Sequence, residues 1–391
     1  MKFVEEKLFQ HMVSLRRRIH KHPELAYQEE KTAAIIIEEL NKLGIETNTG
    51  IGKTGVIGRI CSSSDNSGHV VALRADMDAL AINEETGLEF ASEVNGVMHA
   101  CGHDGHVAML IGAASLLKES LKEGSVLFVF QPAEEGGAGA QKIMESGLLT
   151  KVDAIFACHL DRHFKPGKVV IQEGAISAFT DRFDIAIKGK GGHAAQPHDT
   201  VDAIIVASLI VMSLQTIVSR EVNPVHPSIV SVGKIEGGSV PNAVAERARL
   251  SGTVRTTEEH VREQILAGIK RIVNAAGALH NAEVKVEFTK GYPAVVNTNK
   301  ESEVARRAVI NIIGEDALVD TQYVSMGGED FSFYLEKIPG CFARIGAQKE
   351  GLENIPAHSS TFDFDENALG IGAAFLAEVA KLAICDLAAK K

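Results

Sequence analysis

Two short apolar runs on either side of a long apolar helical pattern constrain the fold most. HVVALRAD (69–76) and SVLFVFQP (125–132) have the length and composition of strands buried on both faces. Between them, residues 106–121 are apolar on nearly every face, as in a helix packed against a sheet. Residues 8–43 have helical spacing broken at Pro23, which predicts two amphipathic helices joined by a turn. The pattern is that of an α/β fold.

The middle third follows another order, βαββαβ, which is the split βαβ arrangement of a small sheet with two helices on one face. Its predicted elements are a strand at 181–189, a helix at 201–219, strands at 227–235 and 245–256, a helix at 258–276 and a strand at 282–290. An apolar helix over 368–384 ends the chain. Because 391 residues exceed the usual size of one core, we expect two domains, 1–178 with 292–391 and an inserted 179–291.

Composition argues against several classes of partner. The net charge is -11, the basic stretches are short, and the chain has no Trp, so nucleic-acid binding is not expected. Apolar runs stay well short of a membrane helix, and MKFVEEKLFQHM lacks a secretory apolar segment. The five cysteines are odd in number and scattered, unlike a disulfide framework. We expect a cytoplasmic protein without a membrane or nucleic-acid partner.

The stretch HACGHDGH (99–106) is dense in metal-binding side chains and precedes a predicted helix. The N-terminus of a helix favours a thiolate at Cys101. Cys101 and His103, two residues apart, can face one point if the loop is extended. Alone, such a pair is more often a buried cysteine beside surface histidines, so further ligands are needed to indicate a metal.

Carboxylates supply part of that set. Glu134 and Glu135 follow the strand at 125–132, where open α/β sheets bind ligands, and neighbouring side chains point in different directions. One could hold a metal while the other stays free as a base; the alternative is a solvated loop. Asp76, which ends the strand at 69–76, could orient a ligating imidazole or simply cap a helix or turn.

Two isolated histidines complete the set. His159 and His358 each lie close to an apolar run, and singly each is more often a satisfied polar residue. With Cys101, His103 and Glu135 they make five ligands, which suit two transition-metal ions sharing a bridge better than one tetrahedral zinc. The other histidines fall on expected surface helices and receive no role, among them His20, His22, His260 and His280.

Eight motifs in order along the chain give a family resemblance. The chain resembles the metal-dependent aminoacylase and carboxypeptidase (zinc peptidase) family, in its branch of hippurate hydrolases, N-acyl amino acid amidohydrolases and auxin-amino acid conjugate hydrolases. The motifs are RRRIHKHPELAYQE, LRADMDAL, MHACGHDGH, VFQPAEEGGAGA, GKGGHAAQPH, GTVRT, MGGEDFSFY and PAHSS.

The resemblance implies a di-metal peptidase-like domain with a central, mostly parallel sheet. Cys101 would bridge the two ions, with His103 and His159 completing one site and Glu135 and His358 the other. The ions would be Zn²⁺ or Mn²⁺, while Co²⁺ or Ni²⁺ also suit these donors.

The implied reaction is hydrolysis of the amide bond of N-acyl amino acids. Glu134 would be the general base and Asp76 would orient a ligating imidazole. A dipeptidase or carboxypeptidase is the alternative within enzymes. A non-catalytic binding protein that keeps the fold is the alternative from another class, and the intact Glu134 argues against it.

For the inserted domain, the resemblance implies a ferredoxin-like lid that also forms a homodimer. His193 would donate to the developing oxyanion, often from the partner subunit, while Asn242 and Arg255 would bind the substrate carboxylate. A hinge is expected near Ala178 and Gly291.

The chain departs from the family pattern in two places. Ala81 stands where proline is common, and Cys158 and the segment 161–163 replace the usual small, apolar and aromatic residues around His159. Both departures bear on acyl-group preference and leave the metal chemistry in place.

Overall fold

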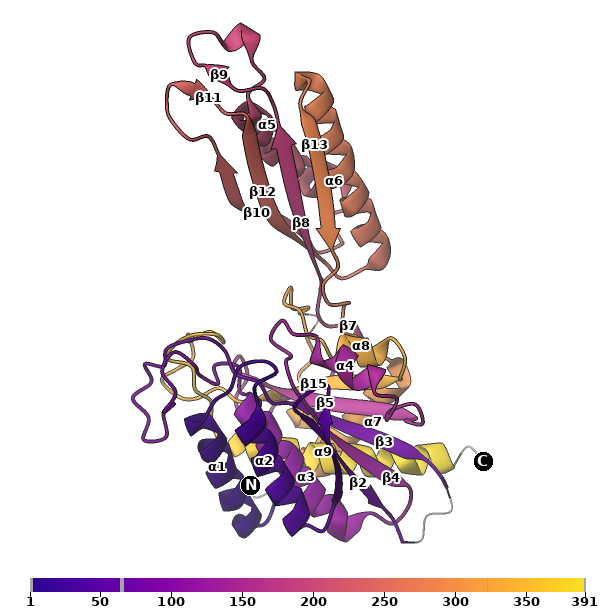
Figure 1. Ribbon diagram of the computed structural model, residues 1–391. Helices are drawn as coiled ribbons and strands as arrows, with labels where there is room; N and C mark the ends of the chain where they lie inside the picture. Colours follow the sequence, from indigo (N-terminus) through magenta and orange to yellow (C-terminus); the bar gives the residue numbers. More distant parts are fainter. Residues whose placement is uncertain (1–2, 64–66, 322, 390–391) are drawn as a thin grey trace. The chain divides into compact units, whose positions relative to one another are not determined.

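The computed structural model describes residues 3–63, 67–321 and 323–389, which cluster into two compact units (Figure 1). The larger unit comprises Met1–Gly174, Val296–Gln322 and Asp330–Lys391, and the smaller comprises Ala175–Val295 and Tyr323–Glu329. The sequence division assigned residues 323–329 to the larger part. The backbone of this segment instead pairs with the smaller unit, where Ser325 N–H donates to the carbonyl of Ile176.

The larger unit alternates helices and strands along most of its length. Its elements are α1 (Glu6–Lys21), α2 (Glu30–Lys42), β1 (Glu46–Ile51), β2 (Gly55–Cys61), β3 (Val70–Asp76), α3 (His103–Ser120), β4 (Ser125–Gln131), α4 (Gly139–Glu145), β5 (Ala154–Asp161), β6 (Val169–Val170), β14 (Val296–Asn297), α7 (Asn299–Ile313), the 3-10 turn η3 (Glu315–Ala317), α8 (Ser332–Leu335), β15 (Gly340–Gly346) and α9 (Asn367–Ala388), with β7 (Gly174–Ala175) at its boundary.

A seven-stranded sheet in the order β1-β2-β4-β3-β5-β15-β6 forms the centre of this unit. The four middle strands, β4, β3, β5 and β15, run parallel to one another, and the flanking strands pair antiparallel. Every residue of β3 and β4 is buried, as their apolar runs predicted. The expected α/β fold with a mostly parallel sheet is confirmed.

Helices α3 and α9 pack against each other beside the sheet (Figure 1). Two glycines permit this close approach: a Cβ on Gly112 of α3 would lie 2.9 Å from Ala373 Cβ of α9, and one on Gly372 of α9 would lie 1.9 Å from Met109 Sδ of α3. Most residues of α3 and α9 are buried, which explains why both helices are apolar on nearly every face.

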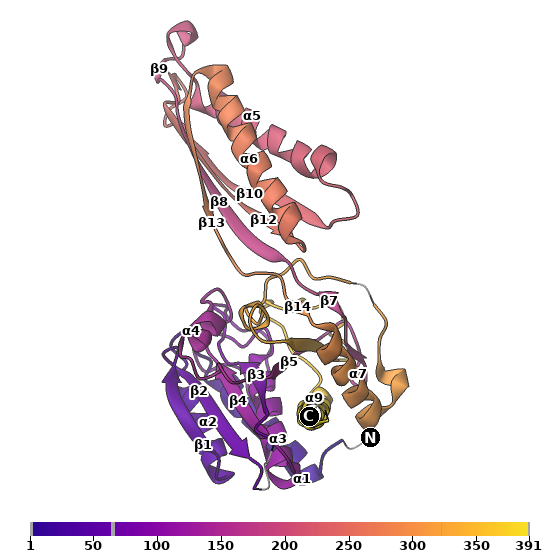
Figure 2. The same ribbon diagram turned by 90° about the vertical axis from the view of Figure 1, so that its right-hand side faces the viewer.

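The smaller unit has the predicted βαββαβ order. Its elements are β8 (Phe179–Lys188), β9 (Gly192–His193), the 3-10 turn η1 (Pro197–Asp199), α5 (Ala203–Thr216), the π-helical turn η2 (Ile217–Glu221), β10 (Ser228–Gly237), β11 (Ala243–Val244), β12 (Arg247–Thr256), α6 (Glu259–His280) and β13 (Glu283–Thr289). The antiparallel sheet has the order β10-β12-β8-β13, and Figure 2 shows α5 and α6 on one face of it. Residues of β8 therefore alternate between buried and exposed.

Two helical segments are long and apolar enough to cross a membrane by length and composition alone. In α9, 78% of the apolar window is buried inside the larger unit. In Ala203–Glu221 the value is 33%, so much of this apolar helix faces outward. The first is a core helix, whereas the second has apolar surface that its own unit leaves uncovered.

One expectation from helix α1 is wrong. His20 was placed on a surface helix, but its ring is fully buried. Its Nδ1 lies 2.8 Å from Asp104 Oδ2 and its Nε2 lies 3.3 Å from Glu84 Oε1. A polar side chain on the core side of the helix is tolerated because both ring nitrogens have partners.

Candidate metal centre

The carboxyl ends of the parallel strands bring the candidate residues to one edge of the sheet. Asp76, the last residue of β3, pairs in register with Gln131, the last residue of β4, and Glu134 and Glu135 follow directly. His159 lies near the end of β5, the other neighbour of β3. Open α/β sheets bind ligands at this edge.

Left-handed backbone occurs beside three of the candidate residues. Gly102, between Cys101 and His103, has a φ of 88° and caps the N-terminus of α3. Ala133, before Glu134, has a φ of 56°, and His358 itself has a φ of 64°. Non-glycine residues rarely adopt this conformation, and such strain concentrates at functional sites.

The five candidate ligands form two groups that share Cys101. The ligand atoms of Cys101, His103 and His159 lie within 4.8 Å of one another, and so do those of Cys101, Glu135 and His358. Cys101 Sγ lies 3.6 Å from His159 Nε2, and Glu135 Oε1 lies 3.1 Å from His358 Nε2. A shared thiolate between two groups is the arrangement of a bridging ligand.

Main-chain carbonyls set the tautomers of two of these histidines. Nδ1 of His103 donates to the carbonyl of Asp78 over 2.9 Å, and Nδ1 of His159 donates to the carbonyl of Leu160 over 2.8 Å. Because a carbonyl only accepts, the hydrogen lies on Nδ1 in both rings. Each Nε2 is then the nitrogen that can bind a metal.

An unsatisfied atom tests whether a metal fits. Nε2 of His103 and Oε1 of Glu135 are buried and make no geometric hydrogen bond to the described residues, although Oε1 of Glu135 lies 3.1 Å from His358 Nε2. A buried polar atom without a partner is costly. Thiolate, imidazole and carboxylate donors match divalent transition metals, so the residues present fit two such ions.

The thiol of Cys101 ionises more readily than an ordinary cysteine thiol, because its pKa is lowered. Burial opposes the thiolate, but the charge of His103 and the contacts of the His103 and His159 imidazoles outweigh it and lower the pKa of Cys101 to about 6. Cys158, the residue before His159 in β5, shows the opposite behaviour, because burial and the charge of Asp76 raise its pKa. Only the thiolate is a good metal ligand, so the two cysteines are chemically distinct.

Asp76 hydrogen-bonds to a histidine that the sequence analysis did not consider. Its Oδ1 lies 2.6 Å from Nδ1 of His106, and its Oδ2 accepts from Arg74 over 2.6 Å. Nε2 of His106 accepts from the N–H of Leu160, so both of its ring nitrogens are engaged. Burial lowers the pKa of His106 to about 4, which keeps it neutral. Asp76 therefore holds His106, which is outside the five-ligand set, and its Oδ2 also lies 3.8 Å from Nε2 of the candidate ligand His103.

Asp78, which the sequence analysis did not single out, also holds the ligand loop. Besides its carbonyl contact with His103, its Oδ2 accepts the N–H of Glu135 over 2.9 Å. The signal was present in LRADMDAL, where Asp78 lies two residues beyond Asp76. Choosing between them required knowing that the chain leaves the sheet after Asp76.

Glu134 is buried next to this set. Its carboxylate lies within 4.8 Å of the ligand atoms of His103 and Glu135. Asp78 holds the backbone of Glu135, which fixes how the two neighbouring carboxylates diverge. The arrangement places a carboxylate beside the two ligand groups, where a base for water would be needed.

The three expected substrate-binding residues lie in the smaller unit at two separate places. His193 of β9 pairs with Ala243 of β11, and the carbonyl of Asn242 accepts the N–H of Ala194, so His193 and Asn242 are neighbours. Arg255 lies near the opposite end of β12, paired with Thr180. The structure therefore joins the first two and separates the third from them within one chain.

The segment that departs from the family pattern is polar and engaged. Asp161, at the end of β5, is buried and accepts from Arg344 over 3.3 Å, and its Oδ1 lies 2.7 Å from Nδ1 of His163. Arg344 of β15 pairs in register with His159. The ion pair between Asp161 and Arg344 thus lies beside the candidate ligand His159, where the family pattern has an apolar run.

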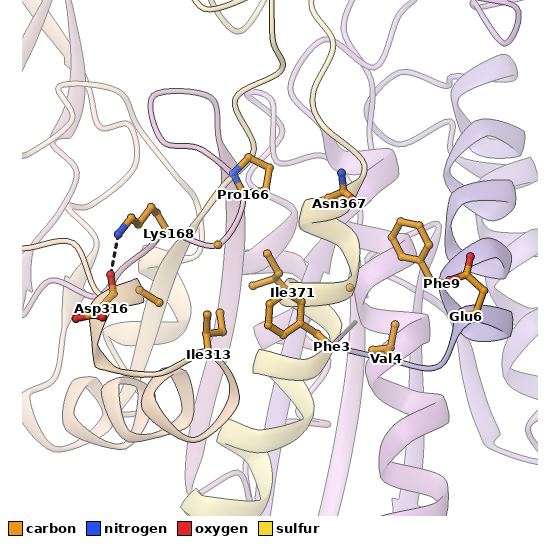
Figure 3. A pocket seen from close by; sticks show the side chains of 13 residues that line it. Phe3, Val4, Glu6, Phe9, Pro166, Lys168, Ile313, Asp316, Asn367 and Ile371 are labelled. Carbon is orange, nitrogen blue, oxygen red and sulfur yellow. Dashed lines mark hydrogen bonds between the residues drawn. The ribbon is translucent and has the colours of Figure 1, made fainter. Parts of the chain in front are cut away.

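A separate pocket of about 750 Å³ lies in the larger unit, and Figure 3 shows its lining. It is framed by the N-terminal segment, α9 and the turn at 166–168, with Lys168 donating to the carbonyl of Asp316 over 2.7 Å. Its lining is largely apolar and shares no residue with the candidate ligands: Phe3, Val4, Phe9, Ile313, Ala317 and Ile371 among them. The chemistry of the metal centre does not involve it.

Comparison with known proteins agrees with this geometry. Residues 72–382 match the model of a family described as peptidase family M20/M25/M40. Thermostable carboxypeptidase 1 of Saccharolobus solfataricus is 40% identical, with 93% of this chain and 92% of that protein covered. N-acetyl-L-cysteine deacetylase of Bacillus subtilis is 41% identical, with 95% and 87% covered.

A solved structure extends the likeness to three dimensions. The Bacillus subtilis YXEP protein, described as a dinuclear metal binding peptidase, superposes with a TM-score of 0.85 at 35% identity. The alignment covers 97% of this chain and 99% of that one. Fold and dinuclear metal binding thus occur together in a protein similar to this chain.

Proposed function

Because the chain belongs to peptidase family M20/M25/M40, we propose that its metal centre hydrolyses the amide bond of N-acyl amino acids, releasing a carboxylic acid and a free amino acid. The family expected from the motifs is confirmed, and the protein is a metal-dependent amidohydrolase with two metal ions. The observation that carries the proposal is the pair of ligand groups sharing Cys101, with Glu134 beside them.

The chain's own residues divide the work as follows. Cys101 would hold both ions, with His103 and His159 on one side and Glu135 and His358 on the other. When bound, two such ions activate water and polarise the substrate carbonyl.

Proton transfer falls to Glu134. It would accept a proton from the attacking water and deliver it to the leaving amine, since it is the carboxylate next to the ligands that the five-ligand set leaves unused. His193, Asn242 and Arg255 remain the proposed groups for the oxyanion and the substrate carboxylate.

We propose Zn²⁺ or Mn²⁺ as the native ions. One thiolate and three imidazoles favour zinc, whereas the carboxylate of Glu135 and an exchangeable water also suit manganese, cobalt or nickel. Elemental analysis of protein purified without chelator would decide among them.

A carboxypeptidase or dipeptidase activity is the second candidate, and the relative named a carboxypeptidase favours it. Both reactions need the same ions and a clamp for the substrate carboxylate. A dipeptide also brings a charged amine, which an N-acyl substrate lacks. A dipeptidase therefore needs a site that accepts this charged amine, whereas an N-acyl amidohydrolase does not.

The deciding experiment compares N-acetyl and N-benzoyl amino acids with the corresponding free dipeptides, before and after EDTA. We expect hydrolysis of the N-acyl compounds to disappear with the metal and return when it is restored. Faster turnover of free dipeptides would favour the peptidase. Binding without turnover, with metal present, would favour a non-catalytic protein.

We also propose a homodimer formed through the smaller unit. Ile204, Ile205 and Met212 of α5 are exposed at 42%, 53% and 71%, and the edge strand β10 exposes Ile235 at 57%. A second copy would cover this apolar surface and the open strand edge. In such a dimer, His193 of one copy could donate to the oxyanion at the metal centre of the other copy. The separation between His193 and Arg255 within one chain favours this arrangement. Light scattering on wild type and Met212→Glu tests this; a monomeric wild type would refute it.

We also propose that the protein is cytoplasmic. The cysteines of the chain are free thiols, including the partly exposed Cys101 that the centre needs reduced. Reducing compartments preserve such thiols. Cell fractionation with an antibody would test the location directly.

A further inference from the structure

A second cluster of metal-binding side chains lies in the smaller unit, among residues to which neither the proposed reaction nor the family motifs give a role. The ligand atoms of His226, Glu258 and His260 lie within 4.8 Å of one another. His260 was expected to be an idle residue on a surface helix. Its side chain instead faces a carboxylate and another imidazole.

The backbone register brings the first two residues together. Strands β10 and β12 pair antiparallel with Ser228 opposite Thr256, so two residues further out His226 stands opposite Glu258. The turn before β10 is fixed as well: His226 N–H donates to the carbonyl of Asn223, and Pro227 restricts His226 to extended backbone. The cluster is thus built at the end of a regular ladder.

The third residue comes from the helix that follows. Glu258 is the N-cap of α6, yet its side chain makes no capping hydrogen bond to that helix. His260 lies in the first turn, two residues on. The carboxylate of Glu258 therefore turns away from its usual partners at a helix start and toward the two imidazoles.

Both imidazoles approach this one carboxylate from different sides. Nδ1 of His226 lies 2.5 Å from Oε1 of Glu258, and Nδ1 of His260 lies 3.4 Å from Oε2. The two rings stand 5.3 Å apart at 89°. The nearby Arg262 is paired with Asp181 and Glu259, so its charge is directed elsewhere.

We propose that His226, Glu258 and His260 form a second metal site, which binds a divalent transition-metal ion of the Zn²⁺ type. Two imidazoles and one carboxylate are a donor set that zinc accepts, with water in the remaining position. Imidazole nitrogen disfavours Ca²⁺ and Mg²⁺, which prefer oxygen. The ion would replace hydrogens now shared between the rings and the carboxylate.

The site is distinct in character from the catalytic centre. The side chains of His226, Glu258 and His260 are exposed at 24%, 39% and 67%, so an ion would exchange freely with solvent. Binding would tie the turn before β10 to the start of α6. An ion that binds only the folded state stabilises it by mass action, so the smaller unit would gain stability with added metal.

The test is equilibrium dialysis of the full-length chain against Zn²⁺ alone, followed by elemental analysis. We expect wild type to bind one more equivalent of zinc per chain than His226→Ala or His260→Ala. His280→Ala, at the other end of α6, is the matched control and should retain the wild-type stoichiometry. Zinc should also raise the Tm of wild type and of His280→Ala more than that of the two cluster variants.

Three outcomes overturn the proposal: equal zinc stoichiometry in all four proteins, an equal loss in His280→Ala, or equal zinc-induced Tm shifts. The first would mean that the cluster is a carboxylate hydrogen-bonded to two histidines and nothing more. Circular dichroism verifies that the variants fold, and Glu258→Gln, which keeps the shape of the side chain, serves as a second variant. Because the readout is stoichiometry, the result holds whether or not the proposed amide hydrolysis is found.

Discussion

Nδ1 of His103 donates a hydrogen bond to the main-chain carbonyl of Asp78, and the side chain of Asp78 accepts the N–H of Glu135. One residue thus positions two candidate ligands that come from different segments of the chain. Its Oδ1 lies only 3.3 Å from Nδ1 of His103, which strengthens the hold on that ring. The geometry of the centre depends on this residue although it belongs to neither ligand group.

Asp78→Ala keeps the main-chain carbonyl that accepts from His103 but removes the carboxylate that accepts the N–H of Glu135 and lies beside the His103 ring. It should therefore weaken metal binding without removing a ligand. Loss of the outer partners of a ligand typically lowers metal affinity about 10- to 100-fold. Competition with a chelator of known affinity measures the change. Asp153→Asn, just before the start of β5 and thus at the opposite end of the strand from His159, is the control and should bind metal as wild type does. Unchanged affinity in Asp78→Ala would contradict the positioning role.

Cys101 and Cys158, the residue before the candidate ligand His159, offer a sharper comparison. Cys101→Ala should lose both ions and the activity together, because the shared ligand of the two groups is gone. Cys158→Ala should keep its metal, since burial and the charge of Asp76 hold that thiol protonated. Elemental analysis of both variants measures the difference. Full metal content in Cys101→Ala would show the cysteine to be structural.

Glu134→Gln separates metal binding from catalysis. The amide keeps the size of the side chain and cannot accept the proton, so turnover should fall by about 10²- to 10⁴-fold, the usual contribution of a general base. Metal content and Tm should remain those of wild type, because Glu134 is outside the five-ligand set. A variant that hydrolyses N-acyl amino acids at the wild-type rate would remove Glu134 from the mechanism.

The sequence predicted the fold well because hydrophobic periodicity is a local property. The runs at 69–76 and 125–132 are typical of buried strands, and they form β3 and β4. The βαββαβ order emerged for the same reason, since each element shows its own period. The sequence did not predict that residues 323–329 belong to the smaller unit, because hydrogen bonds to a segment far away in the sequence decide this.

In the candidate site, too, local patterns predicted some features and three-dimensional contacts determined others. Cys101, His103, Glu135, His159 and His358 were found by residue type and motif, and the fold brings them together. Asp78 was not singled out, because both carboxylates occur in one motif and only three-dimensional contacts tell them apart.

Buried Arg74 adds a connection that the sequence did not suggest. It contacts Asp76, Gln131 and Asp330 at once, with separations of 2.6, 2.9 and 3.0 Å. Asp330, the last residue of the MGGED motif, is thereby tied to the strand end beside the metal centre. The sequence separation of 256 residues between Arg74 and Asp330 hid this contact from any local pattern.

His20 gives the larger unit a stability that depends on pH. Asp104 and Glu84 contact its two ring nitrogens, and Arg16 and His99 lie on the same side. Burial and Arg16 oppose its charge, but the two carboxylates outweigh them and raise the pKa of His20 to about 9. An unfolded histidine titrates near 6.5. The stabilisation is therefore complete below about pH 6.5 and is lost as the pH rises through about 9.

Wild type should thus lose stability between about pH 6.5 and about pH 9 relative to His20→Gln, by an amount of order 3 kcal/mol. Urea unfolding followed by circular dichroism across this range measures the slope. His22→Gln is the control, since that ring is 39% exposed and lies at the end of the same helix; it should keep the wild-type slope. Parallel pH profiles for wild type and His20→Gln would mean that the buried ring is neutral, and that Asp104 is satisfied by Arg16 alone.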